Sequence, residues 1–588
     1  MDELEILIAG AAAVSFDFFD TLVLRPIADP EDAFDILGLM FGITDFRPRR
    51  HAAQVKAFER MRHAGRKEIT LADIYHCMDD TGIASHVLMQ AEYDLELELV
   101  EPNPPMFDLL RRVVASGKPV VIASDMYLPA QFFADALEPH GLRDVPIYIS
   151  CERNATKRDA GELFTLVVQD LGVAPAAILH VGDNLVSDVT RAREQGLAAY
   201  HYLPETRGAD SARPGRLMSS LAVGLLNTRA RDIPAGSYTE LGFLYGGPAA
   251  VGFVHWIEEQ AIQDGVDMIL FLSRDGYALE QLAVTLEGSH LPPSCYFLGS
   301  RTAFTLAAMT EANFNDFIPF LLSGSDGLAT CELLERIGVP APDDGVMEQL
   351  GLGKGVVIRA ALQDKIADFL HAYRHEILKV CRRNRAALYQ YLKQTGLRGG
   401  SKVALVDVGW NGTSQEAFEL AARPLIDLDI YGYYFCLADT PERARRQERQ
   451  RMQAMVNIGN TSSPTMAAIY ANRAVVELFF SAPHPSIIGL EARQDRIVAI
   501  EDPGRGATGH LSPIAQEINA GIAAFARHFY PLRRRLGISL GPVQAAAPLI
   551  DLVTDADWRR RPLLGCVKNF DAWGSSRNHE ITLSDYVS

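Results

Sequence analysis

Apolar runs alternate with amphipathic stretches over roughly the first 200 residues of the chain. Residues 11–24 predict a strand followed by a tight loop, and the runs 119–124, 147–150 and 177–183 predict three further buried strands. The stretches between these last three runs are helical in character. Because strands that alternate with helices form a parallel sheet covered on both faces, the pattern predicts an α/β fold.

A segment without any good strand pattern separates the first predicted strand from the second. Residues 30–100 show apolar positions at helical spacing instead, such as Ala53, Val55, Phe58 and Met61. The place of this segment between two strands predicts an inserted helical cap, over 30–105, that covers one end of the sheet.

A second α/β region is predicted after a break at 204–216, which is rich in turn-forming and charged residues. The runs 266–276, 293–300, 401–414 and 430–438 predict strands, and 310–395 is mostly helical and amphipathic. Another soft boundary lies at 501–509. The predicted division is a first domain at 1–205, a linker at 206–234, a second domain at 235–500 and a mixed C-terminal extension at 501–588.

Composition and charge indicate a soluble globular protein. The formal net charge of −18 argues against a broad nucleic-acid surface, because phosphate backbones need clustered cations. No apolar run is long enough to predict a membrane span, and the apolar start at 1–14 is expected to lead into the first strand. The seven cysteines are scattered without metal-like spacing, which fits the reduced cytoplasm. The oligomeric state does not follow from the sequence.

Four short segments place polar residues at or just beyond the predicted strand ends. Asp17 follows the first strand, Ser124 ends the second, Lys157 lies in a later loop, and Asp183 and Asp188 follow the last strand. Ligands of a parallel sheet bind at the carboxyl ends of its strands. Each of these residues alone is explained equally well as a helix or turn cap. Their ordered combination instead predicts one site that handles a phosphoryl group.

The chemistry of this set fits phosphoryl transfer. A nucleophilic carboxylate at Asp17 can attack phosphorus and form an acyl phosphate, while the Lys157 ammonium neutralises the developing charge. Carboxylates are the ligands that Mg²⁺ prefers, because this hard cation binds oxygen. The predicted residues are Asp17, Ser124 and Lys157 for catalysis, Asp17, Asp183 and Asp188 for the metal, and Thr21 and Asp125 for substrate binding.

The strings around these residues resemble the haloacid dehalogenase (HAD) superfamily of hydrolases over roughly residues 10–205. They are VSFDFFDTL, VIASDMYLP, ATKRDAGELF and ILHVGDNLVSD. The resemblance implies a Rossmann-like core with a helical cap, and Mg²⁺-dependent phosphohydrolase chemistry through an aspartyl-phosphate. SFDFFDTL and ASDMYLP more narrowly resemble a group of large two-domain bacterial members, whose genes are often associated with surface-polysaccharide synthesis.

One position departs from the pattern of the phosphatases in this superfamily. They usually carry a second aspartate, the general acid and base, two residues after the nucleophile, where this chain has Phe19. The next carboxylate is one place later, at Asp20. In an extended loop a shift of one residue reverses the direction of the side chain, so Asp20 is expected to point away from the leaving group and to pin the loop. Dehalogenases of the superfamily also lack the aspartate, which keeps carbon–halogen cleavage as an alternative.

Two loops of the second region resemble phosphate-binding turns. FLSRDGYALEQL and VALVDVGWNGTSQEAFEL each place polar residues after a strand and before a helix, where free backbone N–H groups can hold an anion. The second loop resembles the ribose-phosphate loop of phosphoribosyltransferases, with Val408 in place of the usual second acidic residue, and the first resembles their pyrophosphate loop. The alternative is that both are well-capped structural turns. The candidate residues are Arg274, Asp275, Asp407, Asn411, Thr413 and Ser414.

The sequence therefore predicts a Rossmann-like HAD core with a helical cap, followed by a second Rossmann-like or phosphoribosyltransferase-like α/β domain. The expected function is a cytoplasmic, Mg²⁺-dependent phosphohydrolase for a small phosphorylated metabolite, with a sugar phosphate as one candidate. Two alternatives stay open beside the dehalogenase. One is a transferase, or a protein that binds nucleotides or phosphosugars, with its chemistry in the second domain and a slow or regulatory HAD domain. The other is a scaffold with two degenerate sites.

Overall fold

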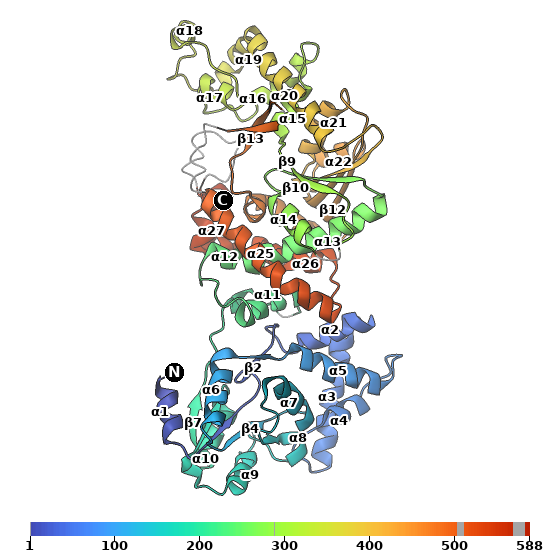
Figure 1. The fold of residues 1–588 in the computed structure, drawn as a ribbon. Helices are drawn as coiled ribbons and strands as arrows, with labels where there is room; N and C mark the ends of the chain where they lie inside the picture. The colour runs from blue at the N-terminus through green and yellow to red at the C-terminus, as the bar shows by residue number, and fades with distance from the viewer. Residues whose placement is uncertain are drawn as a thin grey trace. The chain divides into compact units, whose positions relative to one another are not determined.

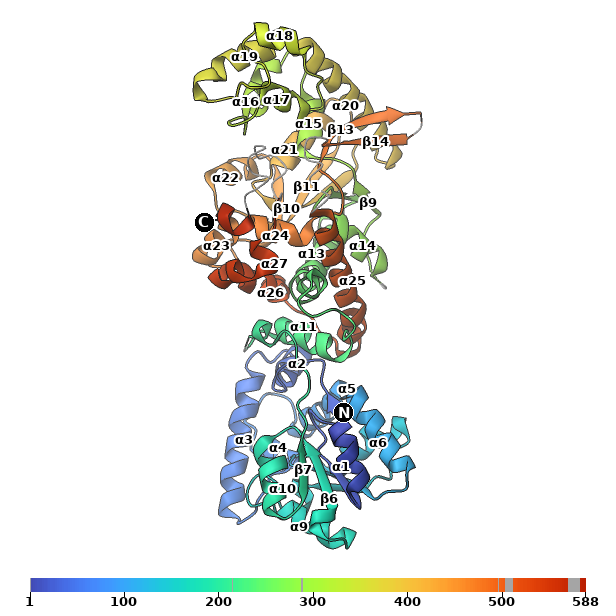
Figure 2. The same cartoon turned by 90° about the vertical axis from the view of Figure 1, so that its left-hand side faces the viewer.

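The computed structural model describes residues 2–213, 215–286, 289–494, 496–502, 511–568 and 582–587. The chain divides into two compact units, one of Met1–Asp232 with His528–Ser539, and the other of Ile233–Arg527 with Leu540–Ser588. The boundary expected at 501–509 lies, from residue 503 onward, outside the described residues. Figures 1 and 2 show the elements of each unit in two views.

The first unit is built on a five-stranded sheet with the order β5-β4-β1-β6-β7, in which every pair of neighbours is parallel. Its three central strands are buried along their whole length, because helices cover both faces of a parallel sheet. The strands are β1 Ala13–Phe16, β4 Val120–Ser124, β5 Ile147–Ile149, β6 Ile178–Gly182 and β7 Ala198–His201. The sequence pattern did not predict β7, whose two alanines have low strand propensity.

Helices α9 and α10 pack on this sheet through Phe164 and Ala192, which share one apolar cluster with Ala13 of β1 and Ile178 of β6. The apolar start of the chain forms helix α1, which ends at Gly10 and leads into β1 at Ala13. The helices outside the cap are α1 Asp2–Gly10, α6 Pro104–Ala115, α7 Ala130–Leu137, α8 Ser150–Arg153, α9 Glu162–Leu171, α10 Arg191–Glu194 and α11 Leu217–Thr228. Helix α11 falls within the segment expected to be a linker.

Four helices form the inserted segment, which lies between the short strands β2 and β3. They are α2 Asp32–Phe41, α3 Phe46–His63, α4 Leu71–His76 and α5 Ser85–Leu99, and the short strands β2 Val23–Leu24 and β3 Glu101–Pro102 pair where the segment leaves and rejoins the core. A buried ion pair ties α3 to α5: Nε and Nη2 of Arg50 each lie 2.7 Å from a carboxylate oxygen of Glu92. The hydroxyl of Tyr75 in α4 donates to the same carboxylate at 2.7 Å.

The second unit contains another five-stranded sheet, with the order β12-β11-β10-β8-β9 and parallel neighbours throughout. Its strands are β8 Met268–Leu272, β9 Ser294–Phe297, β10 Lys402–Trp410, β11 Asp429–Leu437 and β12 Arg451–Val456. The sequence pattern did not predict β12, because its polar residues interrupt the apolar run that marked the other strands. The structure confirms a second parallel α/β domain after the first.

Helices cover both faces of the second sheet. Phe304 of α15, Leu388 of α20 and Phe418 of α21 pack against Leu405 of β10 in one apolar cluster. Phe253 of α13 contacts the ring of Phe435 in β11, at 5.7 Å between centroids, on the other side. The helices from 233 to 308 are α12 Tyr238–Leu241, α13 Gly247–Asp264, α14 Tyr277–Thr285 and α15 Arg301–Ala308.

A separate helical cluster occupies most of the segment 310–395, which the sequence pattern predicted as helical. It contains α16 Ile318–Leu322, α17 Thr330–Glu335, α18 Asp344–Gln349, α19 Gln363–Ala372 and α20 Arg374–Gln394. An antiparallel hairpin of β13 Ile487–Arg493 and β14 Arg496–Glu501 lies beside α20 (Figure 2), where Asn384 accepts a hydrogen bond from the Leu490 N–H.

The remaining helices of the second unit follow β10 or lie near the C-terminus. They are α21 Thr413–Ala422, α22 Pro441–Gln447, α23 Ser463–Ala471, α24 Arg473–Phe480, α25 Leu511–Leu536, α26 Pro542–Thr554, α27 Pro562–Gly565 and α28 Leu583–Val587, with α25 contributing residues to both units. Among the helices that the structure describes, none has the length and apolar character needed to cross a membrane.

Candidate active site

The order of the first sheet reverses between β1 and β6, which lie side by side at its centre. Asp17 directly follows β1, and Asp183 directly follows β6. Crevices at such a reversal, beyond the carboxyl ends of the strands, are where open α/β sheets bind ligands. The topology therefore brings together two carboxylates that are 166 residues apart in the chain (residues 17 and 183).

Lys157 joins two of the predicted carboxylates. Its Nζ lies 2.7 Å from Oδ1 of Asp17 and 2.6 Å from Oδ1 of Asp188, and all three side chains are largely buried. Burial alone would lower the pKa of Lys157, but the two carboxylates outweigh it and raise that pKa. Burial raises the pKa of Asp17, and the neighbouring Lys157 charge offsets part of this effect. The ammonium is therefore held charged against the predicted nucleophile.

Asp17, Asp183 and Asp188 form a compact set of oxygen donors. Each offers a carboxylate oxygen, and these atoms all lie within 4.8 Å of one another. Burial, followed by the charges of the nearby aspartates, raises the pKa of Asp183 to about 7. Lys157 pairs with the other two carboxylates of the set. A cluster with this excess of negative charge fits a hard divalent cation such as Mg²⁺. The Thr21 hydroxyl, predicted to bind substrate, donates to Oδ1 of Asp183 at 3.4 Å.

Residues of β6 and its following loop fix Asp188. His180 Nε2 lies 3.3 Å from Oδ1 of Asp188, and the Asn184 N–H donates to Oδ2 at 2.9 Å. Burial would raise the pKa of Asp188, but Lys157 and His180 hold it well below its usual range. A Cβ on Gly182 would lie 2.4 Å from Cγ of Asp188, so only glycine leaves room for this carboxylate. Sequence reasoning did not select His180 or Gly182.

Asp125 holds the loop that carries Lys157 through hydrogen bonds to its backbone. Its two carboxylate oxygens accept the Lys157 and Arg158 backbone N–H groups, at 2.8 and 2.9 Å. Burial raises the pKa of Asp125 despite these bonds. Ser124, at the end of β4, is buried and lines the same cavity. The geometry gives Asp125 a positioning role toward Lys157 beside its predicted role in substrate binding.

The backbone conformation at Asp20 changes the expectation drawn for its side chain. Asp20 has a φ of 55°, in the left-handed region that few residues other than glycine adopt. The loop is therefore not extended at this residue, and Asp20 lines the cavity together with Asp17 rather than pointing away from it. Burial raises the pKa of Asp20, with a partial offset from the charge of Arg25.

Phe19, at the position of the usual acid, belongs to an aromatic group. Its ring lies 5.9 Å from that of Phe133 and 6.2 Å from that of Phe132, measured between centroids. The guanidinium of Arg25 lies 4.2 Å from the Phe19 centroid and is paired with the buried Glu96 at 2.9 Å. Sequence reasoning missed Arg25 and Glu96, because both fall inside the helical insertion or at its edge, where they resemble ordinary solvated charges.

The cavity above these groups has a volume of about 450 Å³, which is within the range of small-molecule sites. Inserted-segment residues such as Phe34, Gln54 and Glu96 line it together with the catalytic candidates. Every predicted residue of the first site except Thr21 lines this cavity.

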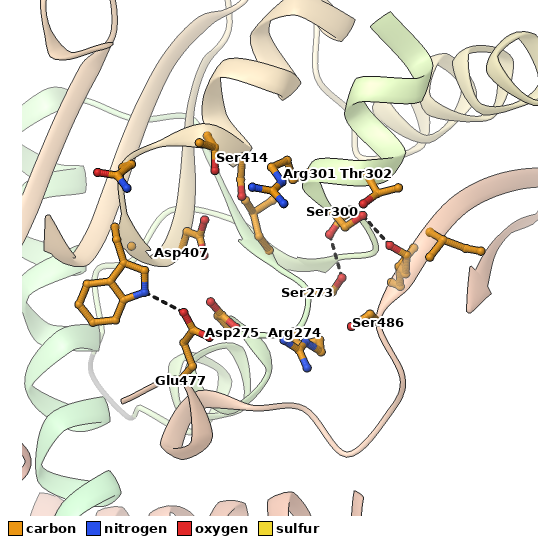
Figure 3. Close-up of a pocket in the computed structure, with 18 of the residues that line it drawn as sticks. Ser273, Arg274, Asp275, Ser300, Arg301, Thr302, Asp407, Ser414, Glu477 and Ser486 are labelled. Atoms are coloured by element: carbon orange, nitrogen blue, oxygen red, sulfur yellow. Dashed lines mark hydrogen bonds between the residues drawn. The ribbon is translucent and has the colours of Figure 1, made fainter. Parts of the chain in front are cut away.

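The six residues predicted in the second unit also surround one cavity, of about 350 Å³ (Figure 3). The order of the second sheet reverses between β8 and β10, and the cavity lies beyond these two strands. Arg274 and Asp275 follow β8, while Asn411, Thr413 and Ser414 follow β10. Sequence reasoning missed several further lining residues, because they come from distant elements: Arg301, Arg336, Tyr470, Arg473, Glu477 and Asp502.

Asp275 and Asp407 form a carboxyl–carboxylate pair in this second cavity. Burial and the Asp407 charge raise the pKa of Asp275, and burial likewise raises the pKa of Asp407, which favours a state with one proton on the pair. The Val408 N–H donates to Oδ1 of Asp407 at 2.9 Å. Trp410 Nε1 donates to Glu477 at 2.8 Å, which fixes a third carboxylate beside the pair.

Solved structures similar to this chain include hydrolases of two kinds. An HAD phosphatase from Thermococcus onnurineus is 21% identical, with 34% of this chain and 89% of the other covered and a TM-score of 0.24. A putative HAD-hydrolase from Bacillus subtilis bound to magnesium is 18% identical, covering 34% and 91%, with a TM-score of 0.27. An L-2-haloacid dehalogenase from Xanthobacter autotrophicus is 18% identical, covering 34% and 80%, with a TM-score of 0.25.

No curated protein matches the chain. A family model does match part of it, over residues that include both the inserted helices and the aspartate cluster. Residues 11–196 match the haloacid dehalogenase-like hydrolase model, so this part of the chain is a haloacid dehalogenase-like hydrolase domain, as its motifs indicated.

Proposed function

We propose that the first unit is a Mg²⁺-dependent phosphohydrolase that acts on a small phosphorylated metabolite. The observation that carries the proposal is the contact of Lys157 Nζ with both Asp17 and Asp188, at 2.7 and 2.6 Å, beside a third carboxylate at Asp183. One cation and three carboxylates at a sheet reversal supply a nucleophile, a charge partner and a metal-binding set.

The reaction would proceed in two displacements. An Asp17 carboxylate oxygen attacks phosphorus, the bond to the leaving oxygen breaks, and an acyl phosphate forms on Asp17. Lys157 stabilises the negative charge on the phosphoryl oxygens, and the Ser124 hydroxyl donates a hydrogen bond to one of them. Water then attacks phosphorus, which releases inorganic phosphate and restores the Asp17 carboxylate.

Mg²⁺ bound by Asp17, Asp183 and Asp188 would supply Lewis-acid stabilisation of the phosphoryl charge. The leaving oxygen needs a proton when it is an alkoxide, and we assign the donation of that proton to Asp20, which lines the cavity with Asp17. Its raised pKa keeps a larger fraction of the group protonated near neutral pH.

The substrate class follows from the cavity. A volume of about 450 Å³ holds a small molecule, and the side chains around it are mostly polar or charged, which suits a hydroxylated phosphate ester. We propose a sugar phosphate as the leading candidate, with a cytoplasmic location that fits the seven free cysteines.

The deciding experiment measures phosphate release from a panel of sugar phosphates and from an aryl phosphate, with Mg²⁺ or with EDTA. The same protein is assayed for halide release from 2-haloacids. Phosphate release that requires Mg²⁺ and Asp17 supports the proposal. Halide release without phosphate release would assign the domain to the dehalogenases instead.

A further inference from the structure

We propose that the cavity of the second unit is a separate binding site for a phosphorylated polyol, with the phosphate held by arginines and hydroxyls at one end and the polyol hydroxyls held by carboxylates at the other. This inference goes beyond the proposed hydrolase activity. Every residue that it uses lies between Leu272 and Asp502, within the second unit.

The phosphate end combines cations with hydroxyl donors. Arg301 lines the cavity beside Ser300 and Thr302, and Arg274 lies between these residues and Asp275 (Figure 3). Arg336 and Arg473 also line the cavity and add positive charge, although Nη1 and Nη2 of Arg336 donate to backbone carbonyls and Nη1 of Arg473 donates to the Tyr470 carbonyl at 3.3 Å. Guanidinium groups bind phosphate oxygens through paired hydrogen bonds, and several around one cavity favour an anion with more than one charged oxygen.

Two helices begin at the same cavity and reinforce its preference for an anion. Helix α21 starts at Thr413, directly after Gly412, and helix α15 starts at Arg301, where the Ser300 hydroxyl caps it by accepting the Ala303 N–H at 3.1 Å. The first turns of both helices line the cavity. Their free N–H groups and partial positive charge add to the field of the arginines.

The other end of the cavity is acidic. Asp275, Asp407 and Glu477 lie toward the side opposite Thr302 and Ser486 in Figure 3. Carboxylates accept hydrogen bonds, and the hydroxyl groups of a polyol donate them. The burial that raises the pKa of Asp275 and of Asp407 favours a protonated carboxyl at this end, which reduces its repulsion of an anionic ligand. Asp502 lies at the other end, where its N–H donates to the Ser486 carbonyl at 2.9 Å. A ligand with an anionic end and a hydroxylated end matches both halves.

Isothermal titration calorimetry of the full chain with EDTA present tests the proposal, because chelation removes metal from the first site. The probes are ribose 5-phosphate, glucose 1-phosphate and glucose 6-phosphate, with ribose, glucose and inorganic phosphate as fragments. We expect saturable binding of at least one sugar phosphate, and binding at least about 10-fold weaker for its two fragments, since each lacks the contacts of one end. Absence of binding by all three sugar phosphates, or equal binding of inorganic phosphate, would overturn the proposal.

Variants locate the binding. Arg274→Ala should weaken it by about 10- to 100-fold, the cost of one charge-assisted contact, and Arg274→Lys should restore part of the loss. Asp407→Asn should weaken the sugar phosphate more than inorganic phosphate. Arg382→Ala removes a solvent-exposed charge of the same unit and should change nothing. Melting temperatures without ligand verify that each variant is folded.

The first site provides the opposing control. Asp17→Asn should leave sugar-phosphate binding in EDTA unchanged within about 2-fold, because the proposed site lies in the other unit. If Asp17→Asn abolishes binding and Arg274→Ala does not, the ligand occupies the first site and the proposal is wrong. Absence of phosphatase activity in the wild-type protein would contradict the proposed function without affecting this result.

Discussion

Lys157 Nζ lies 2.7 Å from Oδ1 of Asp17, although the two residues are separated by 140 positions in the chain. The contact depends on the sheet order, which places β1 at the centre, and on Asp125, which holds the backbone of the Lys157 loop through two N–H groups. Asp17, Lys157 and the loop that carries Lys157 therefore form one hydrogen-bonded network.

Replacing the nucleophile Asp17 is the most direct test of the role of this network in catalysis. Asp17→Asn should lower Mg²⁺-dependent hydrolysis of an aryl phosphate by about 10⁴-fold or more, because the neutral amide does not attack phosphorus. Steady-state phosphate release at saturating Mg²⁺ measures the change. Asp144→Asn, at an exposed position of the same unit, should retain full activity. Activity of Asp17→Asn comparable to wild type, or activity that persists in EDTA, contradicts the assignment.

Removing the cation should affect both catalysis and stability. Lys157→Met leaves Asp17 and Asp188 buried without their shared partner, and breaking a buried ion pair in this way costs about 3–5 kcal/mol. We expect a lower melting temperature without metal, part of which Mg²⁺ restores by replacing the lost positive charge. Differential scanning fluorimetry with and without Mg²⁺ measures both effects. Lys56→Met, at an exposed position of the cap, is the control. Equal melting temperatures of the Lys157→Met and Lys56→Met variants would contradict a stabilising buried ion pair at Lys157.

The sequence predicted the positions of Asp17, Ser124, Lys157, Asp183 and Asp188 because each lies at a strand end or in a loop beside one. Strand ends are visible as the points where an apolar run stops. Arg25 and Glu96 were missed because their proximity to Phe19 depends on how the inserted helices fold back, which no local pattern encodes. Arg473 and Glu477 were missed for the same reason. Both lie in helix α24, and no local pattern shows that this helix contributes to the second cavity.

Backbone conformation explains the misjudged direction of Asp20. Alternation of side chains holds only in extended chain, and one left-handed residue breaks it. Propensity suggests that aspartate tolerates this conformation, but the sequence does not show where it occurs. The strand β7 was missed for a different reason, since Ala198 and Ala199 carry little strand signal and pair only because β6 offers a free edge.

Asp20 should matter in proportion to the basicity of the leaving group. Asp20→Asn is expected to reduce hydrolysis of an alkyl phosphate, such as a sugar phosphate, by about 10²–10⁴-fold, the usual value of general acid–base catalysis. Hydrolysis of an aryl phosphate with an acidic phenol should fall far less, because that leaving group departs without a proton. The ratio of kcat/KM for the two substrates, compared with wild type, gives the answer. Equal losses for both would mean that Asp20 only holds the loop.

The ion pair between Arg50 and Glu92 should dominate the stability of the cap. Both side chains are fully buried, so Glu92→Gln leaves a buried guanidinium without its counter-charge, at a cost of about 3–5 kcal/mol. The double variant Arg50→Met with Glu92→Leu removes both charges and should recover much of the loss. Thermal unfolding of the full chain measures this. Asp79→Asn breaks the exposed pair with Lys56 in the same cap and should leave the melting temperature nearly unchanged. A similar small effect for Glu92→Gln would contradict the prediction.

The carboxyl pair of the second cavity predicts a specific pH dependence. Burial, followed by the charge of Asp407, raises the pKa of Asp275 to about 8 in the folded chain from an ordinary value of 3.8. The folded state therefore holds a proton that the unfolded chain releases, and stability falls as pH rises from about 4 to about 8. Asp275→Asn keeps a hydrogen-bond donor toward Asp407 without a titrating charge, so its melting temperature should fall less over this range.

Thermal unfolding at pH 5, 6, 7 and 8 checks this expectation on the full chain. Each kcal/mol of lost stability lowers the melting temperature by about 2–4 °C for a domain of this size. Asp368→Asn, at an exposed position of helix α19, removes one aspartate from the same unit and should retain the pH slope of wild type. If Asp275→Asn retains that slope as well, the two carboxylates do not share a proton, and the acidic end of the cavity would carry one more negative charge than its geometry indicates.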